Sequence, residues 1–154
     1  MIARLTSLAL ASIVCSAPGI AQDAERAPLW GGVYLSAGFT PDPYEFDLVA
    51  GGPVHSGRAV RSSCPGNITD EPSIEIYYNA GSFPLIFSAF SGIDATLVIL
   101  GPDNVWHCDD DSGHGTNPRI EFNRPHSGSY LIWVGSYAAN TQAPAVLKVS
   151  EIAR

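Results

Sequence analysis

Turn-forming residues set the strongest limit on what this chain can fold into. Fifteen glycines and twelve prolines recur every few residues along its 154 positions. After the first 21 residues no window shows the i, i+3, i+4, i+7 apolar spacing of an amphipathic helix. The segments between turns are short runs of β-branched and aromatic residues. The chain is therefore predicted to be all-β.

Several of these runs alternate between apolar and polar residues, which is typical of strands with one buried face. The alternating runs are residues 44–50, 73–79, 119–123 and 129–135. In the first run Tyr44, Phe46 and Leu48 share one face, and two acidic residues share the other.

Two further runs, residues 84–90 and 95–100, are apolar throughout and are predicted to be buried on both faces. Weaker strand candidates surround Val33 and Val60, and residues 145–150 close the series. Eight or nine short strands at regular spacing favour an antiparallel β-sandwich or a jelly roll.

The N-terminus is typical of an export signal. Arg4 precedes an apolar stretch from Leu5 to Ala17, and Gly19-Ile20-Ala21 supplies small residues for cleavage. The chain is therefore predicted to consist of a signal peptide (1–21), a leader or linker (22–32) and one β-sandwich domain (33–154). The mature protein is expected in the periplasm or outside the cell, and no segment is long and apolar enough to span a membrane.

The charge balance limits the classes of partner that the protein is expected to bind. Removal of residues 1–21 would leave seven basic residues against fifteen acidic ones, a net charge of about −8. Nucleic acid and anionic membranes both require clustered Lys and Arg, whereas here the arginines are scattered and Lys148 is the only lysine. The expected partner is an extracytoplasmic protein or a polysaccharide.

Two cysteines remain after signal removal, Cys64 and Cys108. In an oxidising compartment an even pair predicts one disulfide, and two buried free thiols are the alternative. A bond closing this loop would stabilise the fold by about 4 kcal/mol in the chain-entropy model.

The segment from Trp106 to Pro118 carries three consecutive carboxylates, Asp109, Asp110 and Asp111. Adjacent like charges repel, so a folded domain keeps them in water or around a cation. With Asp94 from a neighbouring strand they form a candidate calcium site, and calcium is the candidate cofactor. The alternative is a solvated turn in which the Asp side chains accept local N–H groups.

Residues of the same segment and of the strands also suggest three other chemistries. His107 and His114 flank the aspartates and suggest zinc, and Ser112 beside His114 suggests a small secreted hydrolase. The sequence lacks the Gly-x-Ser-x-Gly nucleophile elbow, so the protein is predicted not to be an enzyme. Trp133 lies on the opposite strand face from Tyr130 and Val134, which makes it the best candidate for an exposed carbohydrate-binding platform.

An ordered series of short motifs resembles the bacterial pre-peptidase C-terminal domain, a β-sandwich appended to secreted peptidases. The series is residues 92–99 (GIDATLVI), 101–103 (GPD), 109–113 (DDDSG) and 127–134 (SGSYLIWV), within a likeness that spans residues 73–150. Residues 35–43 and 50–52 are similar to a leader on stand-alone secreted proteins of this type. The chain departs from the fused arrangement because it carries no catalytic domain.

The resemblance implies a non-catalytic module that assists a partner, and some relatives bind calcium through the equivalent acidic residues. Carried onto this sequence, those residues are Asp94, Asp109, Asp110 and Asp111. The sequence as a whole therefore predicts an exported, disulfide-bonded binding or structural module.

Overall fold

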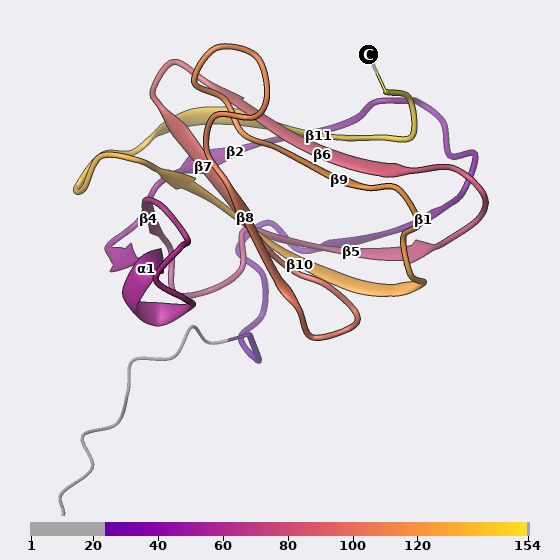
Figure 1. Cartoon of the computed structure of the whole chain (residues 1–154), viewed down its shortest axis with the longest axis horizontal. Coiled ribbons are helices and arrows are strands. Elements are labelled where there is room, and N and C mark those ends of the chain that lie inside the picture. The colour runs from indigo at the N-terminus through magenta and orange to yellow at the C-terminus, as the bar shows by residue number, and fades with distance from the viewer. Residues whose placement is uncertain (1–23, 154) are drawn as a thin grey trace, which may run out of the picture.

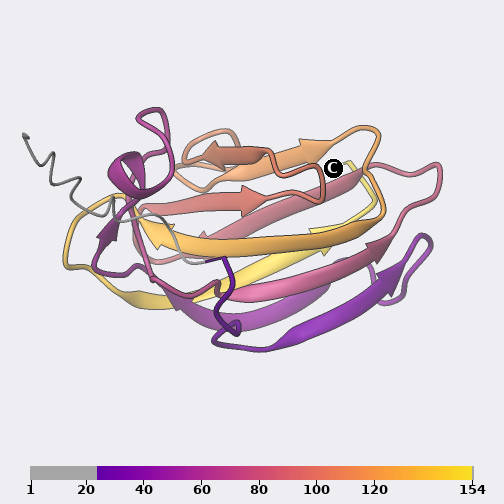
Figure 2. The same cartoon turned by 90° about the horizontal axis from the view of Figure 1, so that it is seen from below.

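The computed structural model describes residues 24–153, so the predicted signal peptide lies outside it. Two β-sheets pack face to face as a sandwich (Figures 1 and 2). This part of the chain holds eleven strands and one four-residue helix, which confirms the all-β prediction. The strand count exceeds nine because β3 (Val54–His55) and β4 (Asn67–Ile68) are only two residues long. None of the described helical residues belongs to a helix long and apolar enough to cross a bilayer.

The larger sheet has seven strands built around β10 (Gly128–Ser136). One side of β10 pairs with β5 (Ile74–Asn79) and, at its end, with β4. Its other side pairs with β7 (Ala95–Leu100), and β7 pairs in turn with β8 (Trp106–Asp109). The far edge is β1 (Gly32–Ser36), which runs parallel to β5, whereas the other pairs are antiparallel.

The smaller sheet is fully antiparallel. Its order is β2 (Tyr44–Ala50), β11 (Ala143–Ser150), β6 (Leu85–Ser91) and β9 (Arg119–Phe122). Strands β11 and β6 are therefore central, and β2 and β9 are the edges.

The main core lies between the two sheets. It is lined by one face of every long strand. Its largest fully buried members are Tyr130, Phe87, Ile74, Ile76, Leu85, Leu97, Ile99, Ile132 and Leu147. The alternation predicted for residues 44–50 and 73–79 is confirmed, because their apolar positions turn inward and their acidic ones outward. Residues 95–99 are buried on both faces, as predicted. The same prediction is wrong for Ser88 and Phe90, which are partly exposed on the outer face of β6.

The chain covers the outer face of the larger sheet with an excursion between β2 and β5, residues 53–68. This excursion contains β3, helix α1 (Ser56–Ala59) and β4. Val60, expected in a strand, instead caps the helix C-terminus. The hydroxyl of Ser56 lies within hydrogen-bonding distance of three backbone carbonyls of residues 64–66, so the excursion folds back on itself.

The predicted disulfide is present and joins Cys64 of this excursion to Cys108 of β8. Beneath it lies a second small core of Ile68, Val98 and Trp133, each with no exposed surface. The disulfide therefore attaches the excursion directly beside the residues that it covers.

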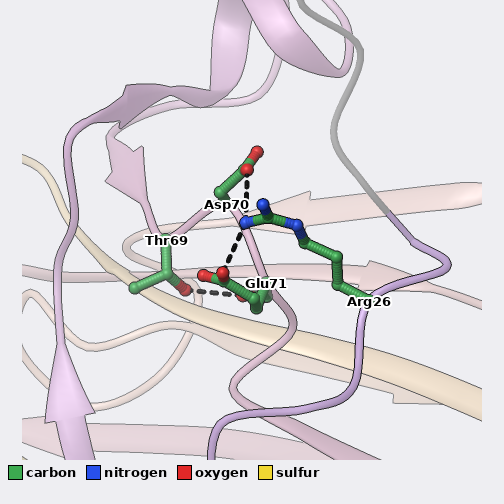
Figure 3. Close-up of polar contacts among 4 residues, drawn as sticks. All are labelled: Arg26, Thr69, Asp70 and Glu71. Atoms are coloured by element: carbon green, nitrogen blue, oxygen red, sulfur yellow. Dashed lines mark hydrogen bonds and ion pairs between the residues drawn. The ribbon is translucent and has the colours of Figure 1, made fainter.

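The segment before β1 also lies against the larger sheet. Arg26 forms ion pairs with Asp70 at 2.9 Å and Glu71 at 2.5 Å, and Thr69 donates to the Glu71 carbonyl (Figure 3). The Leu29 amide then donates to the carbonyl of Pro72. Residues 26–29 are thus tied to the chain that enters β5.

Candidate functional site

A row of polar side chains crosses the outer face of the smaller sheet. Strand register places Lys148 of β11 between Glu45 of β2 and Ser88 of β6, and it places Arg119 of β9 opposite Ser88. Directly opposed residues on paired strands share a face, so all four point away from the core. With strands about 4.8 Å apart, the Cα atoms of Lys148 and Arg119 are separated by about 10 Å across Ser88.

Three members of the row, Ser88, Arg119 and Lys148, form the floor of an open groove of about 690 Å³. The lining residues come from the sheet face, the β8–β9 loop and the C-terminal segment: Pro43, Ile86, Ser88, Phe90, Ser112, Gly113, His114, Arg119, Lys148, Ser150, Ile152 and Ala153. Two cations and three serines belong to this set, but no carboxylate does. In a chain with fifteen acidic and eight basic residues, a lining without a carboxylate is unusual, although each of its two cations is paired with a carboxylate just outside it.

Each cation is positioned by a carboxylate outside the lining. The Lys148 Nζ lies 2.8 Å from Glu45 Oε1, and the Arg119 guanidinium lies 2.7 Å from Glu121 Oε2. The same ammonium lies 5.2 Å from the centre of the Phe90 ring, within cation–π distance. Both ion pairs are partly exposed, so they orient the side chains more than they stabilise the fold.

The β8–β9 loop forms one wall of the groove, and Asp109 fixes the conformation of this loop. Its carboxylate accepts the Ser112 amide at 3.0 Å, the Ser112 hydroxyl at 2.6 Å and the Arg119 amide at 2.8 Å. Farther along, the Gly113 amide donates to the Asn117 carbonyl. Asp109 is thus a loop-fixing residue that joins the start of the loop to the start of β9.

The C-terminal segment forms another wall and is fixed by two carboxylates. The buried Glu151 accepts the Gly38 amide at 2.7 Å and the Tyr78 hydroxyl. Asp42 accepts the Ser150 hydroxyl at 2.5 Å and the Glu151 amide at 3.1 Å. Burial, together with the Glu151 carboxylate, raises the pKa of Tyr78, so this tyrosine stays a hydrogen-bond donor.

The other predicted metal ligands, Asp94, Asp110 and Asp111, are coupled electrostatically. Partial burial raises the pKa of Asp110, and the charges of Asp111, Asp109 and Asp94 raise it further. Burial and then Asp111 raise the pKa of Asp94, one of whose oxygens is buried without a hydrogen-bond partner. Across residues 24–153, however, no three His, Cys, Asp or Glu side chains converge closely enough to hold a metal ion. Calcium binding therefore stays a prediction.

The residues behind the zinc and hydrolase alternatives lie in different places. His114 and Ser112 line the groove, whereas His107 lies against Phe122 beside a pocket of about 60 Å³. The Ser112 hydroxyl donates to Asp109, so its hydrogen is directed toward the loop-fixing carboxylate. Burial lowers the pKa of His107, whose Nε2 is buried without a partner in the described chain.

The prediction that Trp133 is an exposed platform is wrong. The residue does lie on the outer face of β10, as its parity requires, but residues 53–68 cover that face and leave it with no exposed surface. Its ring packs 5.3 Å from that of Trp106. The groove residues Ser88, Phe90, Arg119 and Lys148 were not singled out from the sequence. The sequence indicated them only through the alternation of side chains along β6, β9 and β11, which places them on one face, and through Lys148 being the single lysine.

No family model matches this chain, and no curated protein matches it either. Among solved structures, the chain is similar to the pre-peptidase C-terminal domain of a Bacillus anthracis collagenase, at 15% identity and a TM-score of 0.49, covering 81% of this chain and 98% of that one. It is also similar to PliG, a periplasmic inhibitor of g-type lysozyme from Aeromonas hydrophila, at 15% identity and a TM-score of 0.39, covering 77% and 96%. The first is the kind of domain that the sequence motifs resemble. Likenesses at these values assign neither a family nor a function.

Proposed function

We propose that this protein is an exported, non-catalytic binding module that holds an acidic polysaccharide in the groove on the smaller sheet. The observation that carries the proposal is the groove lining, which has two cations and no carboxylate in an acidic chain. Lys148 and Arg119 flank the Ser88 hydroxyl, so a carboxylate placed over Ser88 would meet a positive charge on either side.

The position of the groove favours a polysaccharide over a peptide. Extended peptides usually bind by adding a strand to a free sheet edge. Most of the groove floor lies on β11 and β6, both central strands whose backbone groups are already paired, and only Arg119 lies on the edge strand β9. Recognition here must use side chains, and the available ones are the two cations, the hydroxyl of Ser88 and the Phe90 ring. These groups suit a hydroxyl-rich, carboxylated sugar chain.

Two features support export and the absence of catalysis. The Cys64–Cys108 disulfide is typical of proteins outside the cytoplasm. Ser112, the groove serine closest in sequence to His114, donates its hydroxyl to Asp109 and not to that histidine. Binding rather than bond cleavage is the chemistry that the groove supports.

The proposal is tested by calorimetric titration with an oligogalacturonate and with a neutral galactan oligomer of the same length. We expect the acidic oligomer to bind and its affinity to fall with added salt, because the contacts are ionic and exposed. The double variant Lys148→Gln, Arg119→Gln should raise the Kd at least about tenfold. The double variant Arg58→Gln, Arg61→Gln, which makes the same change in charge at two exposed positions of the excursion, should leave the Kd unchanged.

Three results would contradict the proposal. Equal binding of the neutral oligomer would exclude carboxylate recognition. An unchanged Kd in the double variant would exclude the groove. Equally tight binding of poly-glutamate would exclude a preference for polysaccharide.

Calcium at the acidic segment is a separate proposal. The mutual repulsion of Asp94, Asp110 and Asp111 supports it, since a cation would relieve that repulsion. Asp109 is already occupied with the loop, so calcium would be bound by the other three carboxylates. These do not converge in the structure, so the β8–β9 loop would have to rearrange around the ion, with backbone carbonyls and water completing its coordination.

A further inference from the structure

Strand β1 is an edge strand without the usual protection against pairing. It ends the larger sheet, with β5 on one side and no other described strand on the other (Figure 2). Edge strands are normally protected by charged residues, prolines or bulges. The sequence of β1, Gly-Val-Tyr-Leu-Ser, contains none of the charged residues or prolines.

The other edges of the two sheets differ from β1 in this respect. Strand β2 carries Glu45 and Asp47, and β9 carries Arg119 and Glu121. Strand β8 ends with Asp109, and β3 is only two residues long. The unprotected edge is therefore particular to β1, among the edges that the structure describes.

The most exposed large apolar side chain of residues 24–153 lies at the centre of this strand. Tyr34 is 80% exposed. It stacks on Tyr77, its direct partner on β5, with ring centroids 4.6 Å apart and an angle of 13° between the planes. Because the partner on β5 covers one face of the Tyr34 ring, the other face is directed beyond the edge of the sheet.

The backbone of β1 presents hydrogen-bonding groups to the same side. The Gly31 carbonyl accepts the Glu75 amide at 3.1 Å, and the Ala37 amide donates to the Asn79 carbonyl at 2.9 Å. Backbone groups alternate in direction along a strand, so the odd-numbered residues 31–37 face β5. The N–H and C=O groups of Gly32, Tyr34 and Ser36 therefore point away from the sheet.

We propose that β1 pairs antiparallel with β1 of a second copy of this chain, on a two-fold axis through Tyr34, to form a homodimer with a continuous larger sheet. The strand is self-complementary about Tyr34. Tyr34 would face its own copy as a hydrogen-bonded pair, Val33 would face Leu35 on the inner side, and Gly32 would face Ser36 on the outer side.

The proposed pairing leaves no group in conflict. The two Tyr34 rings would extend the stack already formed with Tyr77. Val33, which is only partly buried at the margin of the main core, would gain an apolar neighbour. No like charges would face each other within the strand pair, although the chain as a whole is acidic.

The test measures the mass of the oxidised protein by sedimentation equilibrium over about a thousandfold range of concentration, up to about 1 mM. We expect a monomer–dimer equilibrium. Tyr34→Pro removes an N–H that points away from β5 and should weaken the dimer at least about tenfold while leaving the fold intact. Tyr34→Lys should do the same by placing two like charges on the axis. The control is Tyr137→Lys, which changes another exposed tyrosine, 56% exposed, and should leave the dimer intact.

Cross-linking tests the register. A hydrogen-bonded antiparallel pair separates Cα atoms by about 5.5 Å, within the range of a disulfide. Tyr34→Cys should therefore form a covalent dimer in air, whereas Ser36→Cys, which would face Gly32 of the other copy, should not. A wild-type protein that stays monomeric up to about 1 mM, a dimer unaffected by Tyr34→Pro, or equal cross-linking of the two cysteine variants would overturn the proposal.

Discussion

On the outer face of the larger sheet Trp133 has no exposed surface, whereas on the outer face of the smaller sheet Phe90 is partly exposed. Both rings lie on central strands, and both point away from the main core. The difference arises because residues 53–68 and a disulfide cover the first face. The second face has only the β8–β9 loop and the C-terminal segment at its margins.

The two faces therefore differ: the first is structural, and the second is the face at which we propose that a ligand binds. The covered face holds a small apolar core with Trp106 packed on Trp133. The open face holds a row of ion pairs and hydroxyls that includes Lys148, Ser88 and Arg119. The same strand geometry thus serves stability on one side and leaves room for a ligand on the other.

The largest expected effect is that of truncating the two aromatic residues. Trp133→Ala should lower the free energy of unfolding by about 3–5 kcal/mol, because it opens a cavity beneath the excursion. Phe90→Ala should cost less than about 1 kcal/mol, since the ring is already partly solvated. Urea unfolding followed by circular dichroism gives both values. If Trp133→Ala does not fold, Trp133→Phe should still cost more than Phe90→Ala. Equal costs would contradict the distinction between the two faces.

Removal of the disulfide should have the next largest effect. Cys64 and Cys108 are 44 residues apart, so replacing both by Ala should lower the free energy of unfolding by about 3–4 kcal/mol. The excursion should also open locally, exposing Trp133 and Trp106. Acrylamide quenching of tryptophan fluorescence under native conditions should therefore increase in the double variant. Unchanged quenching would show that packing alone holds the excursion.

Much of the fold could be predicted from local pattern. Alternation along residues 44–50 assigned Leu48 to the core correctly, because a period of two determines which side chains share a face. Parity also placed Trp133 opposite Tyr130 correctly. Whether that opposite face meets water depends on residues 53–68, whose covering role needs long-range contacts that no local pattern reveals.

The candidate site was harder to predict for a related reason. Its central row combines residues 45, 88, 119 and 148, which only the register of four strands brings together. The most conspicuous motif, Asp109 to Asp111, lies beside the groove, and its first residue serves to fix the loop. A run of aspartates in a sequence predicts charge repulsion, but it does not show which carboxylate already accepts hydrogen bonds in the folded protein.

Within that run, the three aspartates should differ in their contribution to stability. Asp109→Asn should cost about 1–2 kcal/mol, because an amide cannot accept all three donors that the carboxylate accepts. Asp111→Asn, at an exposed position, should change the free energy of unfolding by less than about 0.5 kcal/mol. Chemical denaturation of the two variants under identical conditions makes the comparison. A larger cost at Asp111 would show that the loop depends on a different carboxylate.

Calcium should change the stability by a similar or smaller amount. If Asp94, Asp110 and Asp111 bind it weakly, millimolar calcium should raise the Tm by a few degrees relative to EDTA, corresponding to about 1–2 kcal/mol. Magnesium should not reproduce the rise, because it demands a tighter octahedral site. Asp94→Asn should abolish the rise, whereas Asp47→Asn, on the exposed side of β2, should preserve it. Equal melting temperatures in calcium and EDTA would make the segment a solvated turn.

The smallest expected effect concerns pH. Partial burial and neighbouring carboxylates raise the pKa of Asp110 above its ordinary value of 3.8. Between that value and the raised one the folded state binds more protons than the unfolded state, so stability falls as the pH rises through this window. Above the window Asp110→Asn should raise the Tm by about one to three degrees, since the residue is partly exposed and water screens the repulsion. Below pH 3.8 the carboxyl is protonated in both states, and the variant and the wild type should melt together. A gain that persisted at low pH would mean that the amide stabilises the loop by a new hydrogen bond, and that charge repulsion at Asp110 is not what the substitution relieves.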